Sequence, residues 1–259
     1  MAPRSSFGIS LNPEIVSYMK SPKPRNGKLD SFFAQGRMLL RVIVLLSGGI
    51  DSTTALYLTK QDVAEIFTLN MVYTKSFDRE AEASRRLAVT AGVKEHLSIY
   101  LPFFKDIERR LHPPPSQTIS SAYLPARNIV FYGVAAAYAE VLGAERIVFG
   151  SNSDDAKELP DAGSAFIQRM NELVRIGTRA GNEGRTIQIV NPLINYGKTE
   201  VLKLAIQLKV PLELTWSCYE DGNVPCGKCR GCVTRLRAFQ ELDMADPLKY
   251  QDRSPKFKA

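Results

Sequence analysis

The sequence predicts an α/β protein with a doubly wound, mostly parallel sheet of five strands, followed by a small cysteine-rich module. Three observations carry this prediction. Short apolar runs rich in branched residues alternate with segments of helical spacing. The first run ends in a Ser-Gly-Gly turn, and all four cysteines lie within residues 218–232. Strands separated by helix-length segments form right-handed βαβ units, whose helices cover both faces of a parallel sheet.

Each predicted element has its own local signal. The strands are expected in the apolar runs at 42–46, 66–73, 95–100, 146–150 and 187–190. The helices are expected at 52–59, 79–91, 128–142, 164–176 and 198–208. Gly92 and Gly143 follow two of these helices, the position where glycine commonly ends a helix. Residues 103–121, with three consecutive prolines, are expected to form the one long irregular insertion.

Composition and charge exclude several classes of protein. Of the 259 residues, 44% are hydrophobic and 24% are charged, which is typical of a globular protein. No apolar run is long enough to cross a bilayer, and residues 1–20 lack the apolar stretch of a secretory signal, so we expect a cytoplasmic protein. The net charge of +7 is concentrated in residues 1–41, which carry seven basic and two acidic side chains. Charge therefore gives little support for direct binding of nucleic acid.

Three parts are expected along the chain. Residues 1–37 contain four prolines and many polar residues, which predicts a partly ordered extension. Residues 38–212 contain the alternating strands and helices of the α/β domain. Residues 213–259 contain the cysteine module and a polar tail.

A loop with two glycines joins the first strand to the first helix. Gly48 and Gly49 allow a sharp turn and a close approach to a ligand. Free N–H groups at the start of a helix favour a bound anion, and Asp51 could hold a hydrated Mg²⁺ beside it. The patterns G-x-x-x-x-G-K-[ST] and G-x-G-x-x-G are absent, which argues against a P-loop kinase and a dinucleotide fold. An ordinary glycine-rich turn is the alternative, but the strand–turn–helix context favours a phosphate site.

The octapeptide from Leu46 to Thr53 resembles the pyrophosphate-binding loop of the N-type ATP pyrophosphatases. The resemblance implies an adenine nucleotide alpha hydrolase-like, Rossmann-like fold, with ATP and Mg²⁺ at the carboxyl ends of the strands. It also implies that a substrate oxygen attacks the α-phosphate and releases pyrophosphate. The implied ATP contacts are Leu46, Ser47, Gly48, Gly49, Asp51, Ser52 and Thr53, with Asp51 also a candidate Mg²⁺ ligand.

The four cysteines are spaced as metal ligands. They are Cys218, Cys226, Cys229 and Cys232, and glycines between them allow tight turns. Four thiolates at these spacings favour one tetrahedral zinc ion in a closed, structural site. An iron–sulfur cluster and a redox-active pair are the alternatives, whereas disulfides are disfavoured in a cytosolic protein.

The cysteine motif, with Trp216 before it and Arg235 after it, resembles the 7-cyano-7-deazaguanine synthase family, often called QueC. Segments around Pro125, Gly150 and Asn191 extend the resemblance over roughly residues 42–240. It implies an ATP-dependent ligase that converts 7-carboxy-7-deazaguanine and ammonia to the 7-cyano compound, through adenylated acid and amide intermediates. The product would serve queuosine or archaeosine biosynthesis. A homodimer is also implied, without direct contact to nucleic acid or membrane.

Six polar residues near predicted strand and helix ends are further candidates for contacts with substrate or phosphate. They are Arg127, Asn128, Asn152, Asp154, Asp161 and Lys198. An ordinary helix cap is the structural alternative for Arg127 and Asn128, and a solvated helix lysine is the alternative for Lys198. For the neighbouring Asp155 and Glu158, a solvated acidic loop is the alternative. The chain departs from the family pattern at residues 74–79, where only the flanking Tyr73 and Glu80 fit, and at Ala162-Gly163. A divergent member that uses the same adenylation on another acceptor, a protein or a tRNA, is therefore the alternative function.

Overall fold

A computed structural model describes residues 40–252 except 62, 64, 74–77, 112–122 and 221. The described residues belong to one compact unit that begins at Leu40. The predicted extension at 1–37 lies outside them, as does most of the departure from the family pattern at 74–79. Among the described helices, none has the length and apolar character needed to cross a membrane.

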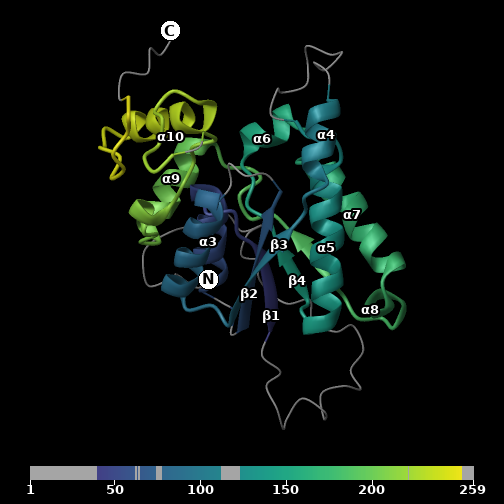
Figure 1. Cartoon of the computed structure of the whole chain (residues 1–259). Coiled ribbons are helices and arrows are strands. Elements are labelled where there is room, and N and C mark those ends of the chain that lie inside the picture. Colours follow the sequence, from purple (N-terminus) through teal and green to yellow (C-terminus); the bar gives the residue numbers. More distant parts are fainter. Residues whose placement is uncertain are drawn as a thin grey trace. The chain divides into compact units, whose positions relative to one another are not determined.

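A five-stranded sheet in the order β3-β2-β1-β4-β5 lies at the centre of the described residues (Figure 1). The strands are β1 (Arg41–Leu45), β2 (Glu65–Val72), β3 (Glu95–Tyr100), β4 (Arg146–Val148) and β5 (Gln188–Val190). Every neighbouring pair is parallel, and Val44 of β1 lies opposite Thr68 on one side and Val148 on the other. The predicted doubly wound fold is confirmed.

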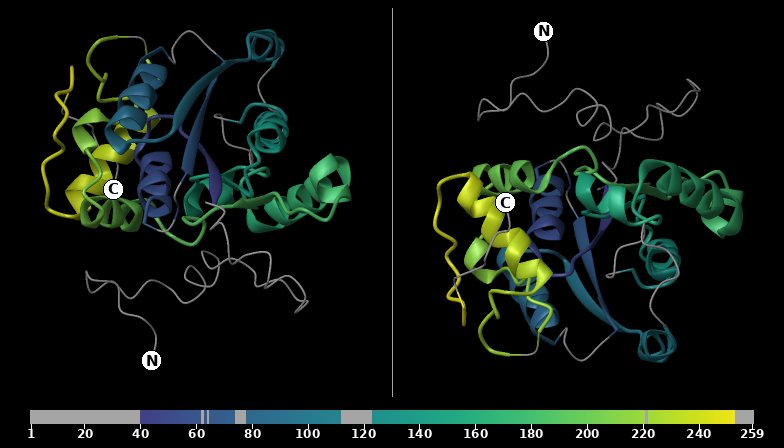
Figure 2. Two further views of the ribbon diagram at one scale, coloured as in Figure 1. Left: turned by 90° about the horizontal axis from the view of Figure 1, so that it is seen from below. Right: turned by 90° about the horizontal axis from the view of Figure 1, so that it is seen from above.

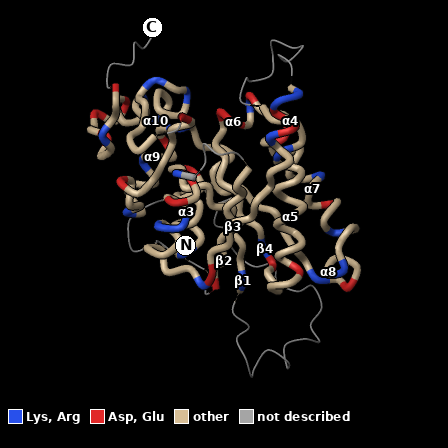
Figure 3. Tube along the Cα trace, viewed as in Figure 1, with Lys and Arg blue, Asp and Glu red and all other residues tan. Residues whose placement is uncertain are grey.

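Helices cover both faces of the sheet (Figures 1 and 2). One face carries α2 (Ile50–Thr59), α3 (Asp78–Ala91), α9 (Lys198–Gln207) and α10 (Arg230–Glu241). The other face carries α5 (Arg127–Leu142) and α7 (Ser164–Gly177). Three short helices lie near this face: α4 (Phe104–Arg110), α6 (Ser153–Glu158) and α8 (Arg179–Asn182). A 3-10 turn at Leu212–Leu214 precedes the cysteines. Lys and Arg are interspersed with Asp and Glu along these helices (Figure 3).

The core explains why the strands are continuous apolar runs. Ile43, Leu69 and Ile147 on three neighbouring strands are completely buried, because helices cover both faces of a parallel sheet. On the α5 side they belong to one apolar cluster with Tyr132, which is also completely buried. This packing holds the carboxyl ends of the strands, and the loops that follow them, at fixed positions.

Four of the described helices, α4, α6, α8 and α10, were not expected from the sequence. The segment predicted to be irregular contains α4, where the Phe104 ring is fully buried and packs against the rings of Tyr73 and Phe131. Burial of one aromatic ring thus fixes a helix that has little apolar periodicity of its own. Helix α6 likewise lacks an apolar face and depends on its cap at Asn152.

Candidate active site and metal centre

The loop after β1 is held in shape by its own hydroxyl groups. The hydroxyl oxygens of Ser47 and Ser52 lie 3.0 Å apart, and the Thr53 hydroxyl donates to the Gly49 carbonyl at 2.7 Å. Gly48 has φ +92°, and a Cβ there would lie 2.7 Å from the Glu80 carbonyl oxygen. Only glycine fits this position, because both the backbone angle and the contact with α3 exclude a side chain.

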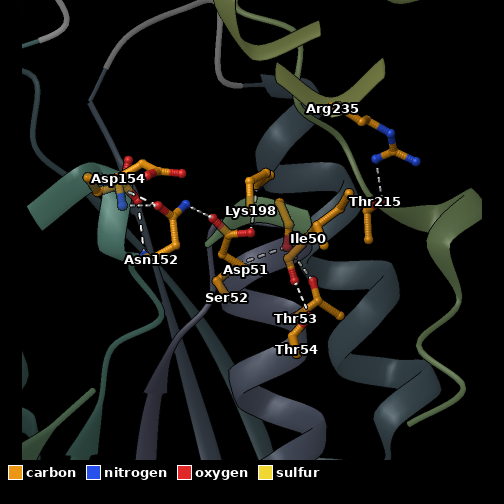
Figure 4. Close-up of polar contacts among 12 residues, drawn as sticks. Ile50, Asp51, Ser52, Thr53, Thr54, Asn152, Asp154, Lys198, Thr215 and Arg235 are labelled. Carbon is orange, nitrogen blue, oxygen red and sulfur yellow. Dashed lines mark hydrogen bonds and ion pairs between the residues drawn. The ribbon is translucent and has the colours of Figure 1, made fainter. Parts of the chain in front are cut away.

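Asp51 is the residue around which three loops meet (Figure 4). Its Oδ1 lies 2.5 Å from the Lys198 ammonium, and its Oδ2 accepts from the Asn152 side-chain amide at 2.8 Å. These residues follow β1, β5 and β4, respectively. Chain order runs outward in opposite directions from the β1–β4 boundary, and such a switch point is where open α/β sheets bind ligands. The structure therefore brings three of the predicted site residues together there.

Asn152 also orders the start of α6. Its Oδ1 accepts the N–H groups of Asp154 and Asp155 at 2.8 and 3.1 Å, and the Asp155 carboxylate accepts the Asn152 N–H in return. The predicted candidate Asp154 directs its carboxylate to Lys157 at the surface, 3.1 Å away. The neighbouring Asp155 is half-buried, and its partial burial and the charge of Asp51 both raise its pKa. The sequence had left a solvated acidic loop as the alternative for Asp155.

A second group of predicted residues lies at the start of α5. Asn128 donates its N–H to Asp161 Oδ2 at 3.2 Å and its side-chain amide to the Asp161 carbonyl at 2.9 Å. Asp161 thus caps α5, whose preceding residue Ala126 has a left-handed backbone and supplies no side-chain cap. The geometry accounts for Asn128 and Asp161 as a structural cap, and their contact with substrate stays a prediction.

Arg127 lies beside a half-buried carboxyl group that the sequence had not assigned to the site. Glu80 stands at the start of α3, and partial burial raises its pKa to about 8 although the charge of Arg127 opposes the shift. Arg127 also donates to the Tyr73 hydroxyl at 3.4 Å, and the charge of Glu80 acts on Tyr219 beside the metal ligands. The only sequence signal for Glu80 was its fit to the family pattern.

Three of the predicted ATP contacts, Leu46, Ser52 and Thr53, have buried side chains. Leu46 is 1% exposed, and its carbonyl accepts from the side chains of Asn70 and Ser84 at 2.9 and 2.7 Å. Thr53 is completely buried, and its hydroxyl is used inside the loop. Leu46 and Thr53 shape the loop from within, whereas Ser47, Gly49 and Asp51 are not fully buried.

The four cysteine sulfurs form a compact cage. All lie within 4.8 Å of one another, and the Cys226–Cys232 and Cys218–Cys229 sulfur distances are both 3.9 Å. Sulfurs in a tetrahedral Zn(Cys)₄ site, with bonds of about 2.3 Å, are separated by about 3.8 Å. A disulfide requires about 2.05 Å. The arrangement therefore fits one metal ion and no disulfide.

Backbone N–H groups point at all four sulfurs, with Gly227 as the donor to Cys232. Cys226 Sγ accepts the N–H groups of Lys228 and Cys229 at 3.4 and 3.2 Å. Cys218 Sγ accepts those of Glu220 and Cys226 at 3.4 and 3.3 Å, and the Tyr219 N–H donates to Cys229 Sγ at 3.4 Å. Such donors stabilise thiolates, which are the form that binds a metal.

Comparison with known proteins gives a consistent result. The family model described as queuosine biosynthesis protein QueC matches residues 41–243. A 7-cyano-7-deazaguanine synthase of Trichodesmium erythraeum (strain IMS101) is 42% identical over 226 residues, covering 81% of this chain and 100% of the relative. The proteins of that name from Nostoc sp. (strain PCC 7120) and Thermosynechococcus vestitus are each 40% identical, covering 82% and 83% of this chain and 97% of each relative.

Proposed function

This chain belongs to the QueC family of queuosine biosynthesis proteins, and on that premise we propose that it is an ATP-dependent C–N ligase. Its substrates would be 7-carboxy-7-deazaguanine and ammonia, and its product would be 7-cyano-7-deazaguanine. The observation that carries the proposal is the meeting of the loop 47–52 with Asn152 and Lys198 at the switch point of the sheet.

We assign the ATP phosphates to this loop. N–H groups at the start of α2 and the hydroxyl groups of Ser47 and Ser52 supply donors for phosphate oxygens. The Lys198 ammonium supplies a positive charge, and Asp51 supplies carboxylate oxygens for the Mg²⁺ that accompanies ATP. In the structure Lys198 neutralises Asp51. When ATP and Mg²⁺ bind, Lys198 would contact the phosphates and Asp51 would contact Mg²⁺, so each charge would keep a partner of opposite sign.

The first half of the proposed reaction activates a poor electrophile. A carboxylate oxygen of the substrate attacks the α-phosphorus of ATP, the bond to the bridging oxygen breaks, and pyrophosphate leaves. Ammonia then attacks the carboxyl carbon, AMP leaves, and one proton is released as the amide forms. Positioning and charge stabilisation supply most of the acceleration in such transfers.

The second half repeats the same step on the amide. The amide oxygen attacks the α-phosphorus of a second ATP, pyrophosphate leaves, and one N–H proton is lost. Release of AMP and the remaining N–H proton gives the nitrile. Both halves require the same geometry at the α-phosphate, so one binding site can support both adenylation steps.

The group around Arg127 is our candidate for the acceptor side. Glu80 and Gly48 are in contact through the first turn of α3, so Arg127 and Glu80 lie next to the phosphate loop. We assign to Arg127 the substrate carboxylate, which matches its charge and its donors. Glu80, with a pKa of about 8, is suited to accept a proton from the attacking ammonia near neutral pH.

We assign zinc to the four cysteines. All four ligand positions are then protein thiolates, so the ion has no open position and supplies folding stability rather than a chemical step. We assign the binding and orientation of the substrates to the loops at the carboxyl ends of the strands and not to the metal.

The proposal is tested by incubating the metal-loaded protein with 7-carboxy-7-deazaguanine, ATP, Mg²⁺ and ammonium. Mass spectrometry should detect the amide first and then the nitrile, with AMP and pyrophosphate formed twice per nitrile. Omission of ammonium should stop the reaction after adenylation. Folded, metal-loaded protein that forms neither the amide nor the nitrile would exclude this substrate, and incubation with unmodified tRNA would then test the other acceptor.

A further inference from the structure

A buried ion pair joins α10 to the segment after it. The side chains of Arg235 and Asp246 are 1% and 3% exposed, and two bonds of 2.7 and 3.0 Å link the guanidinium to both carboxylate oxygens. Asp246 also accepts from the Tyr250 hydroxyl at 2.6 Å and from the Leu248 N–H at 3.0 Å. Removing two charges from water is costly, so an ion pair of this kind is weak evidence for a role in stability alone.

The remaining donors of Arg235 reach back to the segment before the cysteines. One terminal nitrogen donates to the Thr215 hydroxyl at 2.5 Å (Figure 4). The other donates to the Leu212 carbonyl at 3.0 Å. The Thr215 hydroxyl in turn donates to the Leu212 carbonyl at 2.7 Å. Arg235 therefore fixes the position of Thr215, which is 1% exposed.

The next residue contacts the phosphate loop directly. The Trp216 N–H donates to the Gly48 carbonyl at 2.9 Å. A trans peptide is planar, so its carbonyl and its N–H point in opposite directions. Holding the Gly48 carbonyl therefore also sets the direction of the Gly49 N–H, which bonds only weakly to the Ser47 hydroxyl at 3.3 Å.

From these contacts we propose that the Arg235–Asp246 ion pair positions the phosphate-binding loop, acting through Thr215 and the backbone of Trp216. The inference rests on the proposed binding of ATP at that loop. It assigns the ion pair a positioning role, because neither residue touches the loop itself. The guanidinium is suited to it, since a planar fork fixes three partners at once, which a lysine cannot do.

The same segment also leads to the metal ligands. The indole N–H of Trp216 donates to the Cys218 carbonyl at 2.9 Å, and the ring packs against the cysteine cluster. Trp216 is the one tryptophan in the chain. Its fluorescence therefore reports on the segment that connects the ion pair, the metal centre and the loop.

The test compares Arg235→Met, Asp246→Asn and the milder Thr215→Val, which removes only the hydroxyl link. Lys203→Met, an exposed cation on the neighbouring helix α9, is the control for charge. Ile189→Val, in the core of β5, is the control for lowered stability. ATP affinity is measured by calorimetry below the melting transition, together with Trp216 emission and amide exchange of residues 47–52.

We expect Thr215→Val to weaken ATP binding roughly 3- to 10-fold, the loss of about one hydrogen bond, and to speed exchange of the loop amides. Arg235→Met should weaken ATP binding further. Both controls should have the ATP affinity and the loop exchange rates of the wild type. The positioning role would be overturned if Thr215→Val and Asp246→Asn both had the ATP affinity and the loop amide exchange rates of the wild type. A wild type that binds no ATP would instead refute the proposed function, while loop exchange would still report whether the link exists.

Discussion

The ammonium of Lys198 lies 2.5 Å from Oδ1 of Asp51, although the two residues are 147 positions apart in the sequence. Both side chains are largely buried, at 18% and 15% exposed. A cation and a carboxylate at this distance are worth far more in a partly desolvated crevice than at the surface. The pair holds in place the two charges that we assign to the phosphates and to Mg²⁺.

Lys198→Met should therefore remove most of the activity and little of the fold. We expect kcat/KM for ATP to fall by roughly 100-fold, the usual effect of losing one charge-stabilising donor in an active site. Steady-state kinetics with varied ATP measure it. Lys203→Met, at an exposed position of the same helix, is the control and should keep normal activity. Wild-type kcat/KM in Lys198→Met would exclude Lys198 from phosphate binding.

Gly48→Ala should damage both the loop and the fold. The new methyl group would lie 2.7 Å from the Glu80 carbonyl and 2.9 Å from the Ser84 nitrogen, at a φ of +92°. We expect a loss of about 2 kcal/mol in the free energy of unfolding, from backbone strain and a forced shift of α3, and no measurable ATP binding. Thermal melts and calorimetry measure the two effects.

Gly133→Ala is the matched control for that substitution. Gly133 lies inside α5, and a Cβ there meets nothing within 4 Å. Alanine should therefore stabilise the protein by about 0.5–1 kcal/mol. If both variants had the same melting temperature, the crowding at Gly48 would not be what the geometry indicates.

The pattern of the sequence predicts the sheet well because of how the sheet is buried. The strand at Arg41–Leu45 is within one residue of its predicted range, since a strand covered on both faces must be continuously apolar. Helix α4 was missed because Phe104 is its one buried residue, and α6 was missed because a cap rather than an apolar face defines it. Local patterns detect burial along an element and do not detect one anchoring contact.

The candidate site is predictable in its residue types but not in its contacts. The residue types at 47–52 predict a phosphate-binding turn, and the spacing of the four cysteines predicts a metal site. The contact of Lys198 with Asp51 depends on which strands are neighbours at the switch point, and no local pattern contains that order. The charge interactions of Glu80 similarly involve Arg127 of α5 and Tyr219 of the cysteine module, which lie far away in the sequence.

Glu80→Gln should make the protein more stable, and increasingly so as the pH rises. The pKa of Glu80 is about 8 in the folded chain, against an ordinary value of 4.5. Between these values the folded state binds more protons than the unfolded state, so the free energy of unfolding falls as pH rises. Glutamine removes that loss, and at about 1.36 kcal/mol per pKa unit we expect a gain of up to about 4 kcal/mol at pH 8 and below about 1 kcal/mol at pH 5.

Melting temperatures measured from pH 5 to pH 9 test this dependence. Glu82→Gln, an exposed position on the same helix, should show no such trend. The activity of Glu80→Gln should fall at every pH if the carboxylate accepts a proton from ammonia. A stability difference that is constant with pH would mean that Glu80 titrates normally.

Removal of the metal should unfold the C-terminal module and change the emission of Trp216, whose ring packs against the cysteines. We expect one zinc per chain by elemental analysis, and a fall of about 10 °C or more in melting temperature after chelation, because structural zinc contributes its binding energy to folding. Added zinc should restore both signals.

Cys226→Ser should reproduce the loss, since it removes a ligand whose sulfur accepts two backbone N–H groups. Metal release should become easier as pH falls, because protons compete with the metal for the thiolates. Iron in place of zinc, with visible absorption, would identify a cluster instead, and an unchanged melting temperature after metal loss would refute a structural role.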